Sequence, residues 1–85
     1  MRVVEETILV MTKENRPTRI ERGSMSYRVI RMLEYWIVQS KWWLKDERRL
    51  YMHLITDQGM LEIFCTDGDW MLSKLIYLFL FKSYG

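Results

Sequence analysis

Hydrophobic residues along the chain come in short runs, without the spacing of an amphipathic helix. The runs are rich in β-branched and aromatic residues, and turn-forming residues separate them at roughly every ten positions, as in small all-β domains. This pattern predicts one all-β domain over residues 1–85, with five or six mostly antiparallel strands in a meander. Closure into a small SH3-like barrel would remove the exposed sheet edges. The alternative is an open sheet with a short C-terminal helix.

The expected strands are separated by polar or glycine-containing turns. Pro17 should stop any ladder in the connection 12–17, because proline has no amide hydrogen to donate. Gly59 should supply a positive φ in the hairpin turn 57–59. A second turn is expected at 67–69. The strands themselves are expected at 3–11, 18–22, 27–39, 48–56, 60–66 and 70–81.

The run 27–39 is apolar on both alternating sets of positions. Such a strand either lies inside a closed barrel with a covered outer face, or bends at a bulge and changes face. We expect Trp36 and Trp70 to pack at the two ends of the core. The core itself is expected to contain Val29, Leu33, Ile37, Leu50, Leu54, Leu61, Ile63 and Leu72.

Trp42 and Trp43 are adjacent, just before the expected strand 48–56. Neighbouring side chains of an extended chain point to opposite faces. We therefore expect one indole to be buried and the other to meet a second surface or a partner.

Composition and charge limit the classes of protein. The chain has 85 residues, 49% of them hydrophobic, which is enough for a single domain with a real core. Its formal net charge of +2 is too small to indicate nucleic-acid binding by itself. The charges are uneven, however: residues 16–31 contain five arginines and one acid, and residues 57–69 contain four acids and no base. These charges are expected to be solvated edges of a β-protein with some cross-strand pairing, and the alternative is an electrostatically two-sided molecule.

The sequence favours a cytoplasmic location. Acidic residues interrupt the apolar N-terminal segment 1–11, which argues against a signal peptide. The longest apolar stretch, 75–81, falls well short of the roughly 20 residues of a membrane-spanning helix. A lone cysteine, Cys65, excludes an intrachain disulfide.

Catalytic, metal-binding and cofactor-binding sites are not predicted. His53 lies mid-strand and fits a half-buried structural role, whereas Cys65 fits a small core residue. Their strands are hairpin partners, so a Cys65–His53 dyad stays open until the register is known. Asp57, Asp67 and Asp69 fall on turns, where aspartate is common. No phosphate-binding or dinucleotide-binding glycine pattern occurs.

Three binding hypotheses remain. A protein-docking role is favoured by the many Trp, Tyr, Met and Arg residues, the types enriched at interface centres. Single-stranded nucleic acid is the second, since small barrels combine basic grooves with aromatic platforms. A homodimer through 27–39 is the third. The candidate interaction residues are Arg28, Arg31, Lys41, Trp42, Trp43, Lys45, Arg49 and Tyr51.

The order of motifs between Trp36 and Tyr77 resembles a known tail. The Trp42-Trp43 pair is followed by the arginines before Tyr51, the Gly59 hairpin and Trp70-x-Leu72. This order is similar to the C-terminal tail of ImuB-type proteins, the catalytically inactive Y-family polymerase homologues of bacterial mutasomes, and to small free-standing bacterial domains. The resemblance implies a docking role in translesion DNA synthesis and DNA repair, with repair-polymerase machinery as the partner.

Overall fold

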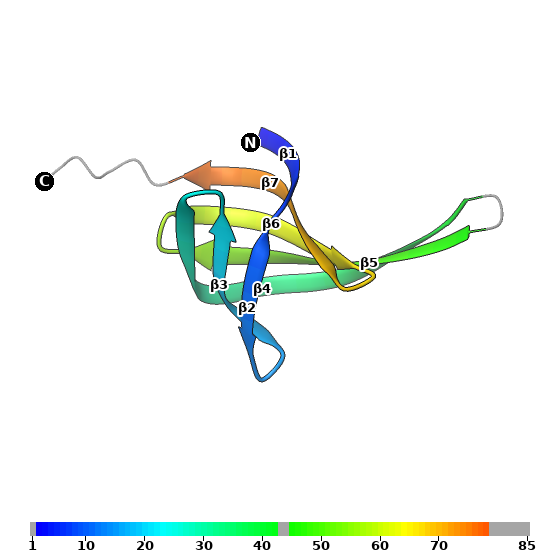
Figure 1. The fold of residues 1–85 in the computed structure, drawn as a ribbon, viewed down its shortest axis with the longest axis horizontal. Coiled ribbons are helices and arrows are strands. Elements are labelled where there is room, and N and C mark those ends of the chain that lie inside the picture. The colour runs from blue at the N-terminus through cyan, green and yellow to red at the C-terminus, as the bar shows by residue number, and fades with distance from the viewer. Residues whose placement is uncertain (1, 43–44, 79–85) are drawn as a thin grey trace, which may run out of the picture.

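The computed structural model describes residues 2–42 and 45–78, and these residues form seven antiparallel strands and no helix (Figure 1). The prediction of a small all-β domain is confirmed. No helix that could cross a membrane occurs in this part of the chain. The strands are β1 (Arg2–Thr7), β2 (Leu9–Lys13), β3 (Arg16–Arg22), β4 (Met25–Trp42), β5 (Lys45–Thr56), β6 (Gly59–Thr66) and β7 (Asp69–Leu78).

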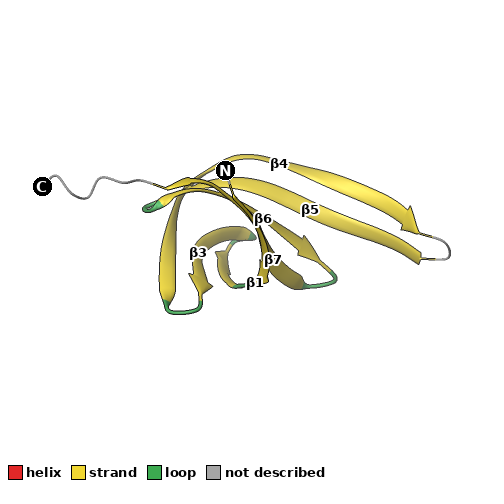
Figure 2. Cartoon of the chain, turned by 90° about the horizontal axis from the view of Figure 1, so that it is seen from above, coloured by secondary structure: helices red, strands yellow, loops and turns green. Residues whose placement is uncertain are grey.

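The seven strands form one curled sheet in the order β1-β7-β6-β5-β4-β3-β2. β1 and β2 stand at opposite ends of this order, yet only Ile8 separates them in the chain. The Ile8 amide donates a hydrogen bond of 3.2 Å to the carbonyl of Trp70, and its side chain is buried. The expected strand 3–11 is therefore two strands, and the sheet curls into a half-barrel (Figure 2).

The turns follow the expected chemistry. Gly59 has a φ of 141°, and Asp67 and Gly68 have φ values of 53° and 83°. The expectation that Pro17 stops any ladder is wrong, because Pro17 lies within β3 and pairs with Thr12 on β2, where the register shifts. The β3–β4 ladder, in contrast, covers only Arg19–Arg22 and stops short of Pro17.

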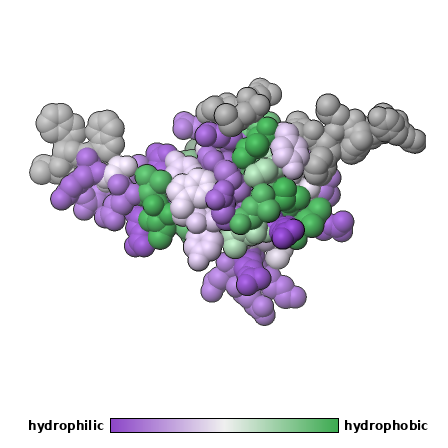
Figure 3. Space-filling model, turned by 180° about the vertical axis from the view of Figure 1, so that it is seen from behind, coloured by the Kyte–Doolittle hydropathy of each residue, from purple (hydrophilic) through white to green (hydrophobic). Residues whose placement is uncertain are grey.

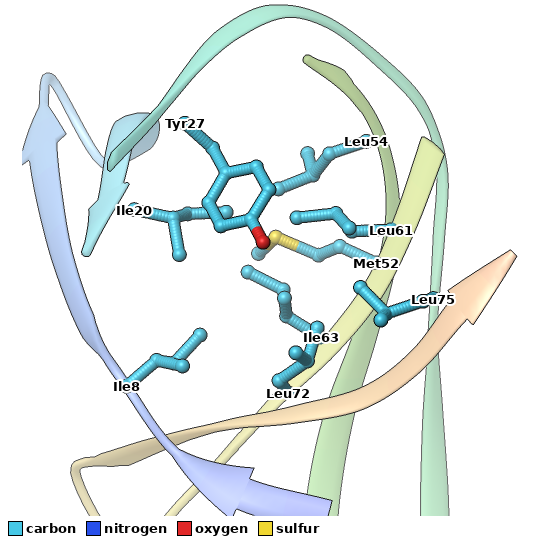
Figure 4. Close-up of a cluster of buried hydrophobic side chains, with 9 residues drawn as sticks. All are labelled: Ile8, Ile20, Tyr27, Met52, Leu54, Leu61, Ile63, Leu72 and Leu75. Atoms are coloured by element: carbon cyan, nitrogen blue, oxygen red, sulfur yellow. The ribbon is translucent and has the colours of Figure 1, made fainter. Parts of the chain in front are cut away.

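The core fills the concave face of the curled sheet, which we call the inner face (Figure 4). Four predicted core residues, Leu54, Leu61, Ile63 and Leu72, are fully enclosed, and Val29, Leu50 and Trp70 pack against them. The Tyr27 hydroxyl accepts a hydrogen bond from Arg22, which also forms a salt bridge with Glu6. The core residues that the sequence prediction missed are Ile8, Ile20, Tyr27, Met52 and Leu75.

The predicted core placement of Leu33 and Ile37 is wrong, since both are about half exposed, at 45% and 50%. The β4–β5 register shifts between Val29 and Arg31 and again between Met32 and Glu34. Each bulge adds one residue to β4, and Leu33 is the extra residue of the second, so alternation fails there. The two bulges together restore the phase, so Ile37 lies opposite Leu50 on the inner face and is exposed because the core does not extend to β4 at that point. The long run thus bends at bulges, which is one of its two predicted forms.

β4 and β5 continue beyond the rest of the sheet as a two-stranded arm. The β5–β6 ladder begins only at Leu50, whereas the β4–β5 ladder continues to the pair Trp42 and Lys45. The arm explains why the molecule measures 54 × 29 × 24 Å (Figure 1). Residues 38–42 and 45–49 pair only with each other within the described chain.

Candidate functional site

β4 has a long edge with which no other strand of the described residues pairs. It pairs with β3 through Met25–Arg28 and with β5 from Val29 to Trp42. After Arg28, its other edge has no ladder partner among residues 2–42 and 45–78. From Glu34 to Trp42 the β4–β5 register runs without a shift. Along this stretch every second residue directs its N–H and C=O away from β5.

The same strand carries most of the exposed large hydrophobic residues of the described chain. Of the nine large hydrophobic side chains that are exposed among the described residues, six lie on β4. Figure 3 shows hydrophobic and hydrophilic side chains side by side on the molecular surface. We call five of the β4 residues the exposed β4 strip: Ile30, Leu33, Tyr35, Ile37 and Val38.

Two adjacent clefts open beside β4 where β3 diverges from it. The larger, of about 670 Å³, lies between the β2–β3 hairpin and residues 29–32 of β4. The smaller, of about 530 Å³, includes Arg28 and Asp57, and Thr18 lines both. The Asp57 carboxylate accepts a hydrogen bond from the Arg28 amide, and the Asp57 amide donates one to the Arg28 carbonyl. This exchange holds two residues of the lining, Arg28 and Asp57, against each other.

The clefts are basic. Five exposed cations line them, against two carboxylates, Glu14 and Asp57. The salt bridges of the described residues use Arg22, Arg49, His53 and Lys74 as their cations, so none of the five is neutralised by a carboxylate there. The five cations are Lys13, Arg16, Arg19, Arg28 and Arg31.

His53 belongs to a polar row on the outer face, opposite the core. Its Nε2 lies 2.7 Å from Oε1 of Glu62, and its Nδ1 lies 3.2 Å from Oε1 of Glu34. Ser73 donates a 2.9 Å hydrogen bond to the other oxygen of Glu62. His53 and Ser73 therefore provide hydrogen-bond partners for both oxygens of the buried Glu62 carboxylate. His53 itself is half-buried, as expected from the sequence. Cys65 pairs with Leu50 in the β5–β6 ladder, on the opposite face from His53, which excludes the dyad.

Aromatic side chains form the neighbouring row of the outer face. Trp36 stacks on Tyr51 with ring centroids 5.5 Å apart, and Tyr51 contacts Phe64 at 5.0 Å. Arg49 lies 4.6 Å above the Phe64 ring and donates a 3.2 Å hydrogen bond to the Tyr51 hydroxyl. Hydrogen bonds from Arg49 to Tyr51 and then to Glu47 raise the pKa of the guanidinium, so it stays charged. The expectation that Trp36 packs at an end of the core is wrong, because it lies on the outer face.

The eight candidate interaction residues do not form one patch. Arg28 and Arg31 line the clefts, whereas Lys41, Trp42 and Lys45 stand at the end of the arm. The ten steps along β4 from Arg31 to Lys41 span roughly 30 Å. Arg49 and Tyr51 contact each other on the outer face. Trp43 lies outside the described residues. The expectation that one indole of the Trp42-Trp43 pair is buried and the other meets a second surface or a partner therefore stays a prediction.

The free edge of β4 and three of the cleft bases, Lys13, Arg16 and Arg19, were missed at the sequence level. The two-sided apolar run 27–39 was the available signal for the edge. The alternative of a two-sided molecule is not supported at Asp57, because this acid of the segment 57–69 lies beside Arg28 in one cleft. Comparison of the chain with protein-family models, with curated proteins and with solved structures finds no match.

Proposed function

We propose that this protein is a non-enzymatic, cytoplasmic docking module, and that an extended segment of a protein partner adds to the sheet along the free edge of β4. The single observation that carries the proposal is the regular, unpaired edge from Glu34 to Trp42 in a strand that also bears the exposed β4 strip. Main-chain hydrogen bonds supply affinity in strand addition, and alternate side chains supply specificity.

β4 is a better receiving edge than the two terminal strands of the sheet. β1 and β2 have six and five residues, and each carries a register shift in its ladder. Short and irregular edges are the usual protection against unwanted strand pairing. The arm of β4 has neither form of protection between Glu34 and Trp42.

The docking role agrees with the role implied by the resemblance to ImuB-type tails. A repair-polymerase partner and a place in translesion synthesis rest on that order of motifs alone, and they are part of the proposal.

Hydrogen exchange with a strand-forming probe tests the docking role. The probe is a blocked peptide of alternating Thr and Val, as long as the regular part of the β4 ladder. We expect it to slow exchange of outward-facing β4 amides between residues 34 and 42. Ile37→Lys should abolish this protection, whereas Leu9→Lys, the matched change at an exposed position of β2, should leave it intact. Protection on β1 or β2 instead of β4, or none, contradicts the proposal.

Single-stranded nucleic acid is the second candidate, and the un-neutralised Arg28 and Arg31 favour it. Titration with oligothymidylate at increasing salt tests it, because binding through phosphates falls steeply with salt concentration. Salt-sensitive binding that Arg31→Glu abolishes, in place of peptide binding at β4, would replace the docking role.

A further inference from the structure

We infer that the partner segment is acidic at the end that lies against β3, and that this end occupies the basic cleft between the β2–β3 hairpin and β4. The inference rests on the proposed docking role and names the chemistry of the partner. It follows from the place where the free edge begins, and from the charges gathered there.

The cleft lies directly in line with the free edge. The β3–β4 ladder ends at the pair Arg19 and Arg28, and the next residues of β4, 29–32, form one wall of the larger cleft. A strand that pairs with β4 beyond residue 33 and continues toward β3 therefore enters this cleft. Its volume of about 670 Å³ is within the range of roughly 300–1,000 Å³ that ligand pockets have.

The charge of the larger cleft indicates which kind of partner segment would bind there. Lys13, Arg16 and Arg31 line it together with one acid, Glu14, and none of the three cations has a salt bridge within the described residues. Complementary charge steers association and fixes the register of a docked strand. Carboxylates at one end of the partner would neutralise these cations, while apolar residues farther along would cover the arm.

The surroundings favour polypeptide over nucleic acid. Apart from basic and polar side chains, Pro17, Val29, Ile30 and Met32 line the larger cleft, and neither cleft has an aromatic residue in its lining. Sequence-independent binding of single strands depends on aromatic side chains on which bases stack. The Trp36–Tyr51 pair is already stacked within the outer face.

Four alternating Thr-Val peptides of equal length test the inference. They carry a run of Glu or a run of Lys at either the N- or the C-terminal end. We expect one Glu peptide to bind about tenfold more tightly than the uncharged peptide, and its Lys counterpart more weakly. Arg31→Glu should abolish the tighter binding of the Glu peptide. Arg48→Glu, the same charge change at an exposed position of β5 outside the cleft, should leave that difference in affinity intact.

The outcomes separate the inference from the docking role. Equal binding of the Glu, Lys and uncharged peptides at β4 would overturn the acidic partner and leave strand docking standing. No binding of any peptide would overturn both. Salt-sensitive binding of oligothymidylate in the cleft, lost in Arg31→Glu, with no preference for Glu peptides, would assign the cleft to nucleic acid.

Discussion

Tyr35 and Met52 lie directly opposite each other in the β4–β5 ladder, yet Tyr35 is 64% exposed and Met52 only 6%. The core therefore ends at β5 along this part of the sheet, and the inner face of β4 is left bare. A strand that extends beyond the core it belongs to offers both backbone and apolar side chains to a partner.

Truncation of the two residues of this pair should have unequal effects on stability. Met52→Ala should cost about 2–5 kcal/mol, because it leaves a cavity in the core. Tyr35→Ala should change the free energy of unfolding by about 0.5 kcal/mol or less, as at most exposed sites. Urea denaturation of both variants measures the difference. Equal losses would show that Tyr35 is covered in the folded protein.

The buried Glu62 carboxylate should depend on His53 more than on any exposed partner. His53→Ala removes the closest partner of a largely buried group and should cost about 1–3 kcal/mol. Glu34→Ala removes an exposed carboxylate on the other ring nitrogen and should cost less than about 1 kcal/mol. A double-mutant cycle of His53→Ala with Glu62→Gln should show coupling, and strict additivity would contradict the pairing.

Backbone conformation alone should determine the effect of Gly68→Ala. A Cβ at Gly68 would meet no atom within 4 Å, but its φ is 83°. An L-residue in this region costs roughly 1–2 kcal/mol, so the variant should melt at a lower temperature. Gly23→Ala, with a φ of 57° and equally open space, is the matched case and should show a similar loss. Unchanged stability in both would contradict the turn geometry.

The melting temperature should not depend on protein concentration. If the free edge of β4 were covered by a second copy of the chain, dimer formation would raise the melting temperature with concentration. The proposed partner is a different protein, so melting curves over a hundredfold range of concentration should coincide. A rise that Ile37→Lys abolishes would favour the homodimer predicted as an alternative from residues 27–39.

Alternation along one strand could be read from the sequence, and the path of a strand across the fold could not. Leu61 and Ile63 were placed correctly because β6 pairs with β5 without a register shift. Leu33 was misplaced because it is the extra residue of a bulge, and hydrophobicity alone does not locate a bulge. Ile37 lies opposite Leu50 on the inner face, as alternation predicts, but it is exposed because the core does not reach β4 there. Ile8 and Ile20 were missed because their burial depends on how the ends of the sheet curl together.

In the candidate site, too, single residues could be selected from the sequence, but their neighbours from other strands could not. Arg28 and Arg31 were selected from the sequence, but Lys13 and Arg16 join them only through the β2–β3 hairpin. Arg49 and Tyr51 were selected as interaction residues, and the structure places both against Phe64. The positions of these side chains depend on which strands lie side by side, and the sequence of a single segment does not contain that information.

Amide hydrogen exchange of the free protein, followed by NMR, tests the central claim most directly. If β4 has a free edge, amides from Glu34 to Trp42 should fall into two alternating sets. One set is protected by β5, and the other exchanges nearly as fast as exposed loop amides. Addition of the alternating Thr-Val peptide should then slow the fast set. Uniform protection along β4 in the free monomer would show that the edge is already covered, and would contradict the account.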